Sequence, residues 1–432
     1  MRIALLSGEY PPMPGGVGDY TRRLGQALVA RGHQVLVFTI YDLQFTIYDL
    51  RHQDDTHISE IVNRKSDWGW RCWREVIAAL EATHPEVLHL QYQTSAYAMH
   101  PAINLLPWRL RGLPNRPRVA VTAHDLLLPY LLPKAGPLRR WVTRRLLADA
   151  DAAVVTNEGD LIEASRFELR DRRLGADTQP PTRIPPPLAL IPIGSNIPVA
   201  PPPGYERAAW RAGLGVAPDQ TLIAFFGLIS HSKGLHVLLD ALARLPASFR
   251  LIVVGGEATQ PMDRAYAAKI RRQIEERGLR DRTIMTGHCA EEHVSAHLLA
   301  ADLAALPFAD GASFRRGSLL AALAHGLPVI TTTDDRRPTA EQEPRIEAQE
   351  PRPIAALHMR QIEQLADDKN VLLVAPENPA LLAATIERLA GDTALRARLG
   401  ESGRELAAQF SWERIAEQHE ALYQNLLGRG PI

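Results

Sequence analysis

Short apolar runs alternate with amphipathic segments along most of the chain, and this alternation predicts the fold class. Each run is short enough for a buried strand, and the segments between the runs have the apolar spacing of helices. In the first half the apolar runs are residues 2–7, 34–39, 87–92, 118–122, 152–156 and 188–192, with helical patterns at 17–31, 73–82 and 138–147. Buried strands that alternate with helices are typical of a parallel sheet covered on both faces.

The pattern is interrupted once and then restarts. Residues 194–204 are rich in proline, which is typical of a linker. Apolar runs then recur at 222–226, 250–254, 283–286, 303–306, 328–332 and 371–374, again with helical patterns between them. We therefore predict an α/β protein of two Rossmann-like domains with a hinge near 194–204. The expected parts are residues 1–197, 205–410 and a C-terminal helix within 411–432, with loop insertions at 166–187 and 334–369.

Composition narrows the functional classes. A chain of 432 residues is long enough for two or three domains, and its formal net charge of zero gives no reason to expect nucleic-acid binding. The two cysteines are too far apart in sequence for zinc-ligand spacing or a disulfide framework, which favours a reducing compartment. The first apolar run is too short for a signal peptide, and no apolar run is long enough to span a membrane. We expect a cytoplasmic protein.

Two glycine loops each separate an apolar run from a helical pattern. The first is residues 15–18, and the second begins at Gly227 and leads to Lys233 and Gly234. Backbone N–H groups at a helix N-terminus bind anions, and glycines permit close approach. The dinucleotide fingerprint G-x-G-x-x-G is absent, which disfavours an NAD-dependent oxidoreductase but leaves it as an alternative, with Asp42 as its candidate ribose ligand.

Charged and titratable residues follow several predicted strands. Lys233 starts a helix predicted over residues 233–244 and can pair with phosphate, although a solvated surface lysine is the default interpretation. Arg315 and Arg316 open another predicted helix. Two cations at a helix N-terminus oppose the helix dipole, which is unfavourable unless both bind a shared anion. His124 follows the run at 118–122, although a single histidine is more often structural. Asp149 and Asp151 precede their strand, at the end opposite to where ligands gather, so we predict no metal site.

Together these segments resemble the family-4 retaining glycosyltransferases (glycosyl transferases group 1), which have the GT-B fold. The resemblance covers nearly the whole chain and rests on residues 10–18, 32–33, 122–125, 191–194, 226–234, 255–256, 321–329 and 410–413. It implies two Rossmann-like domains facing an interdomain cleft and a C-terminal helix that crosses back to the first domain.

The resemblance also implies a reaction. A sugar would move from a nucleotide-diphosphate donor, held mostly by the second domain, to an acceptor hydroxyl on the first domain, without a metal or other cofactor. His124 matches the family's active-site histidine and Lys233 its phosphate-binding lysine. The predicted catalytic residues are His124, Lys233, Arg315 and Arg316. The predicted donor-binding residues are Gly15, Gly16, Gly227, Lys233, Gly256, Ser313, Arg316, Gly317 and Ser318. The predicted acceptor-binding residues are Tyr20, Gln91 and Asp125.

The chain departs from the family pattern at three positions. Leu228 stands where the family usually has arginine, and Ser313 and Ala321 stand where it usually has two glutamates. Donor contacts must therefore differ, and Arg315 and Arg316 are candidates to replace some of the phosphate contacts. A catalytically weakened or non-catalytic nucleotide-sugar-binding protein is the main alternative. The acceptor stays open between a glycan, a lipid-linked molecule and a small molecule.

One helical pattern carries a possible partner surface. In residues 137–147 a stripe of Leu138, Trp141, Val142 and Arg145 lies beside further arginines at 139, 140 and 144. Such a helix either packs its apolar stripe on the sheet or makes weak contact with an anionic membrane. We favour the first interpretation.

Overall fold

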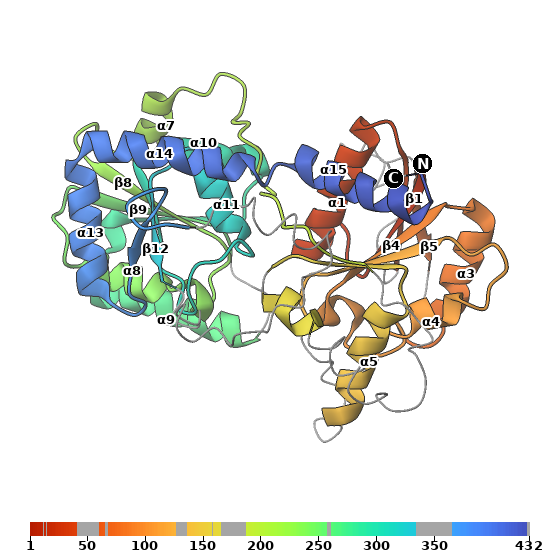
Figure 1. The fold of residues 1–432 in the computed structure, drawn as a ribbon. Coiled ribbons are helices and arrows are strands. Elements are labelled where there is room, and N and C mark those ends of the chain that lie inside the picture. The colour runs from red at the N-terminus through yellow and green to blue at the C-terminus, as the bar shows by residue number, and fades with distance from the viewer. Residues whose placement is uncertain are drawn as a thin grey trace, which may run out of the picture. The chain divides into compact units, whose positions relative to one another are not determined.

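The structure, a computed structural model, describes residues 1–11, 13, 15–40, 60–64, 68–126, 136–157, 159–165, 187–256, 261–333 and 365–429. These residues form two compact units (Figure 1). The first holds the described residues up to Gly194 and those from Trp412 onward, and the second holds those from Ser195 to Ser411. Most of the two predicted insertions, and Asp42, lie outside the described residues.

The described part of the first unit contains a seven-stranded parallel sheet in the order β3-β2-β1-β4-β5-β6-β7. Its strands are β1 (Arg2–Ser7), β2 (Gln34–Ile40), β3 (Glu60–Arg64), β4 (Val87–Tyr92), β5 (Arg118–Ala123), β6 (Ala152–Val155) and β7 (Leu188–Leu190). The predicted apolar runs are therefore confirmed as strands. The sequence analysis missed β3, which begins and ends with a charged residue. The strand order reverses between β1 and β4.

Helices cover this sheet, and one of them comes from the end of the chain. They are α1 (Gly16–Ala30), α3 (Cys72–Thr83), α4 (Leu106–Leu110), α5 (Gly136–Ala148), α15 (Trp412–Leu426) and the 3₁₀ turn η1 (Thr94–Tyr97). Tyr20 and Leu24 of α1 share a buried core with Ile415 and Tyr423 of α15. The C-terminal helix therefore packs on the first unit, as the family resemblance implied.

The described part of the second unit contains a six-stranded parallel sheet in the order β10-β9-β8-β11-β12-β13. Its strands are β8 (Thr221–Phe226), β9 (Phe249–Val254), β10 (Thr283–Gly287), β11 (Leu303–Leu306), β12 (Val329–Thr332) and β13 (Leu372–Val374). Its helices are α7 (Arg207–Gly213), α8 (Leu235–Leu242), α9 (Pro261–Glu276), α10 (Glu291–Ala300), α11 (Gly317–Ala324), α13 (Pro379–Gly391) and α14 (Thr393–Ala408), with the 3₁₀ turns η2 (His231–Lys233) and η3 (Arg280–Arg282). The strand order reverses between β8 and β11.

Two helices begin later than the sequence predicted. Lys233 ends η2, and Gly234 separates it from α8 because its positive φ of 71° is incompatible with a right-handed helix. Similarly, α11 begins at Gly317, so Arg316 lies at its N-cap and Arg315 precedes it. Lys233 therefore lies in a 3₁₀ turn, and Arg315 and Arg316 lie in the loop before α11. Among the described residues, no helix is long and apolar enough to cross a membrane.

Candidate functional site

Both units bring predicted site residues to the point where the strand order reverses. In an open parallel sheet, ligands gather at the carboxyl ends of the strands on either side of such a point. In the second unit this point lies between β8 and β11, and the segments that follow them carry Gly227, Lys233 and Arg316. In the first unit it lies between β1 and β4, near Tyr20, Gln91 and His124.

Close backbone contacts fix the loop that carries Lys233. A Cβ atom added at Gly234 would lie 1.8 Å from the Pro307 carbonyl oxygen, and one added at Gly255 would lie 2.4 Å from the Gly227 carbonyl oxygen. Both glycines also have positive φ. Only glycine fits these two positions, so the backbones after β8, β9 and β11 pack directly against one another.

The Lys233 side chain lies at the centre of this packed loop. Its stem passes Gly227, since a Cβ added there would lie 3.6 Å from Lys233 Cε. Its ammonium group donates a hydrogen bond to the Ser318 hydroxyl at 3.2 Å, in the first turn of α11, and lies 5.2 Å from the centre of the Phe308 ring. Two predicted donor-binding residues, Lys233 and Ser318, are therefore in direct contact.

A second cation faces the same aromatic ring. The Arg316 guanidinium lies 4.9 Å from the centre of the Phe308 ring and forms an ion pair with Asp310. Burial, and next the positive charge of Arg316, lower the pKa of Lys233 to about 8. Two cations at one ring with one carboxylate leave a net positive charge, which an anionic ligand would stabilise. Phe308 and Asp310 were not predicted to contribute through this contact, because their positions relative to Lys233 depend on the tertiary fold.

The other predicted donor residues lie near this cluster or beside it in sequence. The Gly256 carbonyl accepts a hydrogen bond from Ile229 N at 3.1 Å, which ties the loop after β9 to the loop after β8. Ser313 and Gly317 are half-buried on the segment that carries Arg316, whereas Arg315 is exposed to solvent. Their role in donor binding stays a prediction.

In the first unit, α1, β4 and β5 assemble a compact polar cluster. His124 directly follows β5, and its Nε2 lies 3.1 Å from the amide oxygen of Gln91, so Nε2 carries the proton and donates. The Tyr20 ring meets the His124 ring edge-on with centres 4.6 Å apart. Burial lowers the pKa of His124 to about 3, so this imidazole is neutral in ordinary buffers.

Two buried polar groups of this cluster lack hydrogen-bond partners. They are Gln91 Nε2 and the Tyr20 hydroxyl, for which the described residues provide none. Buried donors of this kind are nearly always satisfied in native proteins, by protein, water or ligand. The cluster can therefore receive a neutral, hydroxyl-bearing group. Asp125, the third predicted acceptor residue, is half-buried next to His124.

Behind this cluster, α15 is held by a buried network that the sequence did not reveal. His89 of β4 hydrogen-bonds Thr122 through Nε2 at 2.7 Å and Tyr423 through Nδ1 at 2.5 Å. Burial, with a smaller effect of His419, lowers the pKa of His89 well below its usual value. Burial likewise lowers the pKa of His419 to about 4. The C-terminal helix therefore packs on the layer that supports His124.

The first glycine loop already contains an anion of its own. Glu9 accepts hydrogen bonds from Val17 N at 2.9 Å and Gly18 N at 3.4 Å, at the N-terminus of α1. A Cβ added at Gly15 would lie 2.1 Å from the Glu9 carboxyl carbon. The need for glycine at position 15 is thus explained by Glu9. Donor binding by Gly15 and Gly16 stays a prediction. The backbone N–H groups of Val17 and Gly18, at the start of α1, already donate hydrogen bonds to Glu9.

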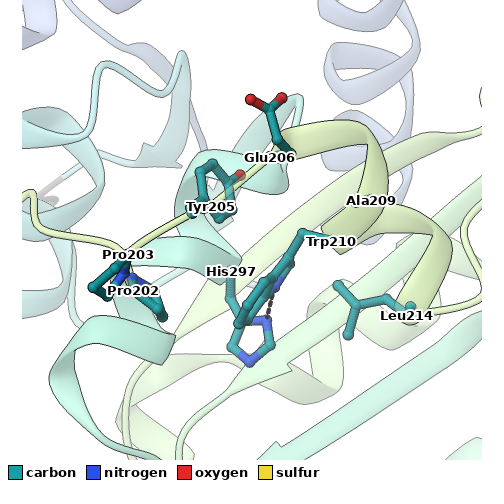
Figure 2. Close-up of a pocket in the computed structure, with 10 residues that line it drawn as sticks. Pro202, Pro203, Tyr205, Glu206, Ala209, Trp210, Leu214 and His297 are labelled. Atoms are coloured by element: carbon teal, nitrogen blue, oxygen red, sulfur yellow. Dashed lines mark hydrogen bonds between the residues drawn. The ribbon is translucent and has the colours of Figure 1, made fainter.

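Two further features lie away from these clusters. Asp149 pairs with Arg111 and Arg145, and Asp151 pairs with Arg116 at 2.6 Å, so both carboxylates have cationic partners. The second unit has an open hollow with a volume of about 390 Å³. It is lined by the segment before α7, by α7 and Leu214 after it, and by His297 of α10 (Figure 2). Trp210 donates a hydrogen bond to His297 at its wall. None of the predicted site residues lines this hollow.

Helix α5 buries only part of the apolar stripe that its sequence predicts. Val142 is buried, at 6% exposure, whereas Leu138 and Trp141 are exposed at 52% and 48%. The expectation that the whole stripe packs on the sheet is thus wrong, because the buried face is centred nearer to Leu146.

Comparison with known proteins agrees with this fold. Residues 15–174 match a family model described as a glycosyl transferase 4-like domain, and residues 220–392 match one described as glycosyl transferases group 1. Among curated proteins, a D-inositol 3-phosphate glycosyltransferase from Xylanimonas cellulosilytica is 26% identical, over 100% of this chain and 98% of its own length. A glycogen synthase from Mycobacterium tuberculosis is 25% identical over 98% of this chain and 94% of its own.

Solved structures show the same architecture. A sucrose-phosphate synthase from Thermosynechococcus elongatus has a TM-score of 0.66 and 24% identity, with 99% of both chains covered. HepE from Anabaena, solved in complex with UDP, has a TM-score of 0.67 and 19% identity, with 98% of this chain and 100% of that chain covered. Two Rossmann-like units with a C-terminal helix define a protein of the GT-B class. The chain belongs to the group 1, family-4 glycosyltransferases.

Proposed function

We propose that this glycosyltransferase moves a sugar from a nucleotide-diphosphate donor to an acceptor hydroxyl with retention of anomeric configuration. The observation that carries the proposal is the pair of cations, Lys233 and Arg316, at the Phe308 ring beyond the carboxyl ends of β8 and β11. A diphosphate supplies the negative charge that this pair lacks. HepE, which shares the fold, was solved with UDP and with UDP-glucose, which supports a donor of this class.

Lys233 and Arg316 would act on the leaving group. As the bond between the sugar and the diphosphate breaks, negative charge grows on the phosphate oxygens, and preorganised cations stabilise it. Loss of one such group typically costs ~3 kcal/mol, about a hundredfold in rate. With a pKa of about 3, neutral His124 is too weak a base to accept the proton of the acceptor hydroxyl, so in this proposal the departing phosphate takes that proton. Neutral His124, with Gln91 and Tyr20, binds and orients hydroxyl groups.

One observation supports a second candidate function. Ala321, which stands at the position of a family glutamate, is completely buried within α11, and the Ser313 hydroxyl replaces the other carboxylate. The chain therefore lacks, at both positions, the carboxylates that would contact sugar and ribose hydroxyls. A nucleotide-sugar-binding protein with weak or no turnover is the alternative.

A donor screen separates these functions. The protein is incubated with a panel of nucleoside-diphosphate sugars, and ¹H NMR follows both donor hydrolysis and the anomeric configuration of the product. Turnover with retention supports the proposal. Saturable donor binding without turnover supports the binding protein. An inverted product contradicts the retaining mechanism, and binding of NADH in place of every donor would favour the oxidoreductase alternative.

A further inference from the structure

The chain enters the first unit for a second time at Trp412. The second unit ends at Ser411, and Trp412 is the first residue of α15, which packs on α1 (Figure 1). The Trp412 side chain is half-buried and packs against the core cluster that contains Tyr20 and Ile415. The proposed reaction gives no role to α15, so the position of this indole beside Tyr20 needs a separate explanation.

Tyr20 contacts both the Trp412 ring and the His124 ring. The centres of the Trp412 and Tyr20 rings are 5.1 Å apart, with their planes at 66°, and the centres of the Tyr20 and His124 rings are 4.6 Å apart, with their planes at 76°. Edge-to-face contacts of this kind are a preferred geometry for aromatic pairs. Tyr20 is also only 2% exposed, so its ring has little room to move. A change at Trp412 therefore affects His124 through one intervening ring.

The remaining contacts of His124 do not fix the tilt of its ring. Its backbone N–H donates to the Tyr92 carbonyl at 2.8 Å, and its Nε2 donates to Gln91 at 3.1 Å. One hydrogen bond holds one ring nitrogen but permits the ring to tilt about that bond. Within the described part of the chain Nδ1 has no hydrogen-bond partner, and with the proton on Nε2 it is an acceptor. The tilt therefore decides where the Nδ1 lone pair points.

Other side chains attach α15 to the first unit. Ile415, Leu422 and Tyr423 are buried in the same core, and Tyr423 hydrogen-bonds His89 at 2.5 Å. Trp412 precedes all three along the helix. Loss of its ring should therefore leave α15 in place, and the effect of the ring on Tyr20 can be separated from the attachment of the helix.

We propose that Trp412 is a positioning residue for His124 and acts through the Tyr20 ring. The indole supports Tyr20, and Tyr20 holds the imidazole in the orientation in which Nε2 donates to Gln91 and Nδ1 can accept a hydrogen bond from a substrate hydroxyl. The role of that hydroxyl rests on the proposed function. The orientation of the imidazole does not, and it is measurable without turnover.

The test is ¹H–¹⁵N NMR of the histidine rings in the full chain, labelled with ¹⁵N-histidine. The His124 signals are those that disappear in His124→Gln. In wild type they should report one neutral tautomer, with the proton on Nε2. Trp412→Leu keeps an apolar side chain but removes the ring, so both neutral tautomers should be populated. Trp412→Phe keeps a ring and should retain the wild-type signals.

Phe410 provides a matched control two residues earlier in the chain. It is 2% exposed, and its ring packs against Phe314 of the second unit, with the ring centres 4.5 Å apart. Phe410→Leu makes a similar replacement of a ring by an aliphatic side chain and should leave the His124 signals as in wild type. Thermal unfolding of each variant verifies that it is folded at the temperature of the spectra.

Kinetics give a second measurement. With a donor that turns over, Trp412→Leu should lower kcat by up to about a hundredfold, because a displacement of about 1 Å can have that effect. The dissociation constant for a nucleoside diphosphate should be unchanged, and Trp412→Phe should restore most of kcat.

Three results would overturn the proposal. They are wild-type His124 signals in Trp412→Leu, an equal change of those signals in Phe410→Leu, and an unchanged kcat in Trp412→Leu when its His124 signals are altered. The first would mean that Trp412 only anchors α15. Absence of turnover in wild type with every donor is a different result, because it contradicts the proposed function while the NMR comparison still decides whether Trp412 orients His124.

Discussion

The surroundings of the Lys233 side chain favour the binding of an anion. Its side chain is half-buried, its ammonium group lies at the Phe308 ring, as does the Arg316 guanidinium, and its pKa is about 8, below the ordinary value for lysine. A diphosphate between the two cations would favour the charged form and raise this pKa. Affinity for the diphosphate is therefore linked to the protonation of Lys233.

We accordingly predict a pH dependence of ligand binding. Above about pH 8 free Lys233 loses its proton, so the dissociation constant for a nucleoside diphosphate should rise as pH increases from about 7 to about 9.5. In Lys233→Arg the guanidinium stays charged, and the same titration should be nearly flat. Isothermal titration calorimetry at several pH values measures both. Parallel pH profiles for the two proteins would show that Lys233 does not govern binding.

Gly234 tests the packing of the same loop. In Gly234→Ala the new Cβ would meet the Pro307 carbonyl oxygen at 1.8 Å in a left-handed backbone conformation. We predict a loss of ~3 kcal/mol or more in the free energy of unfolding, since backbone must move. Gly32 is the matched control, because its φ is also positive, at 84°, but a Cβ there meets nothing within 4 Å. Gly32→Ala should cost only ~1–2 kcal/mol in urea unfolding. Equal losses for the two variants would contradict the close contact.

At the scale of elements, strands were easier to predict than helix starts. Buried parallel strands such as β8 and β11 are almost entirely apolar, and their predicted positions are confirmed. The edge strand β3 was missed because polar residues dominate it. The starts of α8 and α11 were misplaced because they depend on Gly234 and on the tertiary contact of Arg316 with Phe308, neither of which local spacing encodes.

The attachment of α15 to the first unit depends on buried neutral histidines. His89, His124 and His419 all have pKa values lowered by burial. In the unfolded chain they bind protons below about pH 6.5. In the folded chain His419 binds a proton only near pH 4 and His124 only near pH 3, and the pKa of His89 lies well below its usual value. The unfolded state therefore binds more protons in this window, and stability is lost as pH falls through it.

We predict that the free energy of unfolding falls between about pH 6.5 and about pH 4, with up to ~1.4 kcal/mol per pH unit for each of His124 and His419. His419→Asn, which cannot titrate, should have a shallower dependence by about one proton while it keeps a hydrogen bond to the Ile415 carbonyl. Urea unfolding at several pH values gives both slopes. Identical slopes for wild type and His419→Asn would mean that His419 is already protonated in the folded protein.

At the scale of the whole molecule, sequence spacing predicted candidate ligand-binding residues but did not predict the tertiary contacts that position their side chains. It named Lys233, Ser318, Gln91 and His124, which the fold brings into contact in two clusters. Their role in ligand binding stays a prediction. It missed Phe308, Asp310 and Glu9, whose contacts join segments that are distant in sequence or turn back across a loop. Tertiary contacts of this kind are set by the complete fold, so no local pattern contains them.

The two units together should catalyse transfer without a metal ion. The sequence places no ligand cluster after a strand, and both carboxylates of the Asp149 and Asp151 pair are engaged by arginines. We predict that turnover of a verified donor is unchanged in excess chelator. Loss of activity with EDTA, restored by magnesium or manganese, would show that an acidic residue outside these pairs holds a metal.

Calorimetric titration of nucleoside diphosphates measures whether Lys233 and Arg316 bind the diphosphate of a nucleotide donor. We predict saturable binding of at least one nucleoside diphosphate, weakened about 10-fold to about 100-fold in Lys233→Ala because a charge-assisted hydrogen bond is lost. The control Lys269→Ala alters an exposed lysine on α9 and should bind as wild type does. Absence of binding for every common nucleoside diphosphate, or equal affinity in Lys233→Ala and wild type, would show that these two cations do not form the diphosphate site.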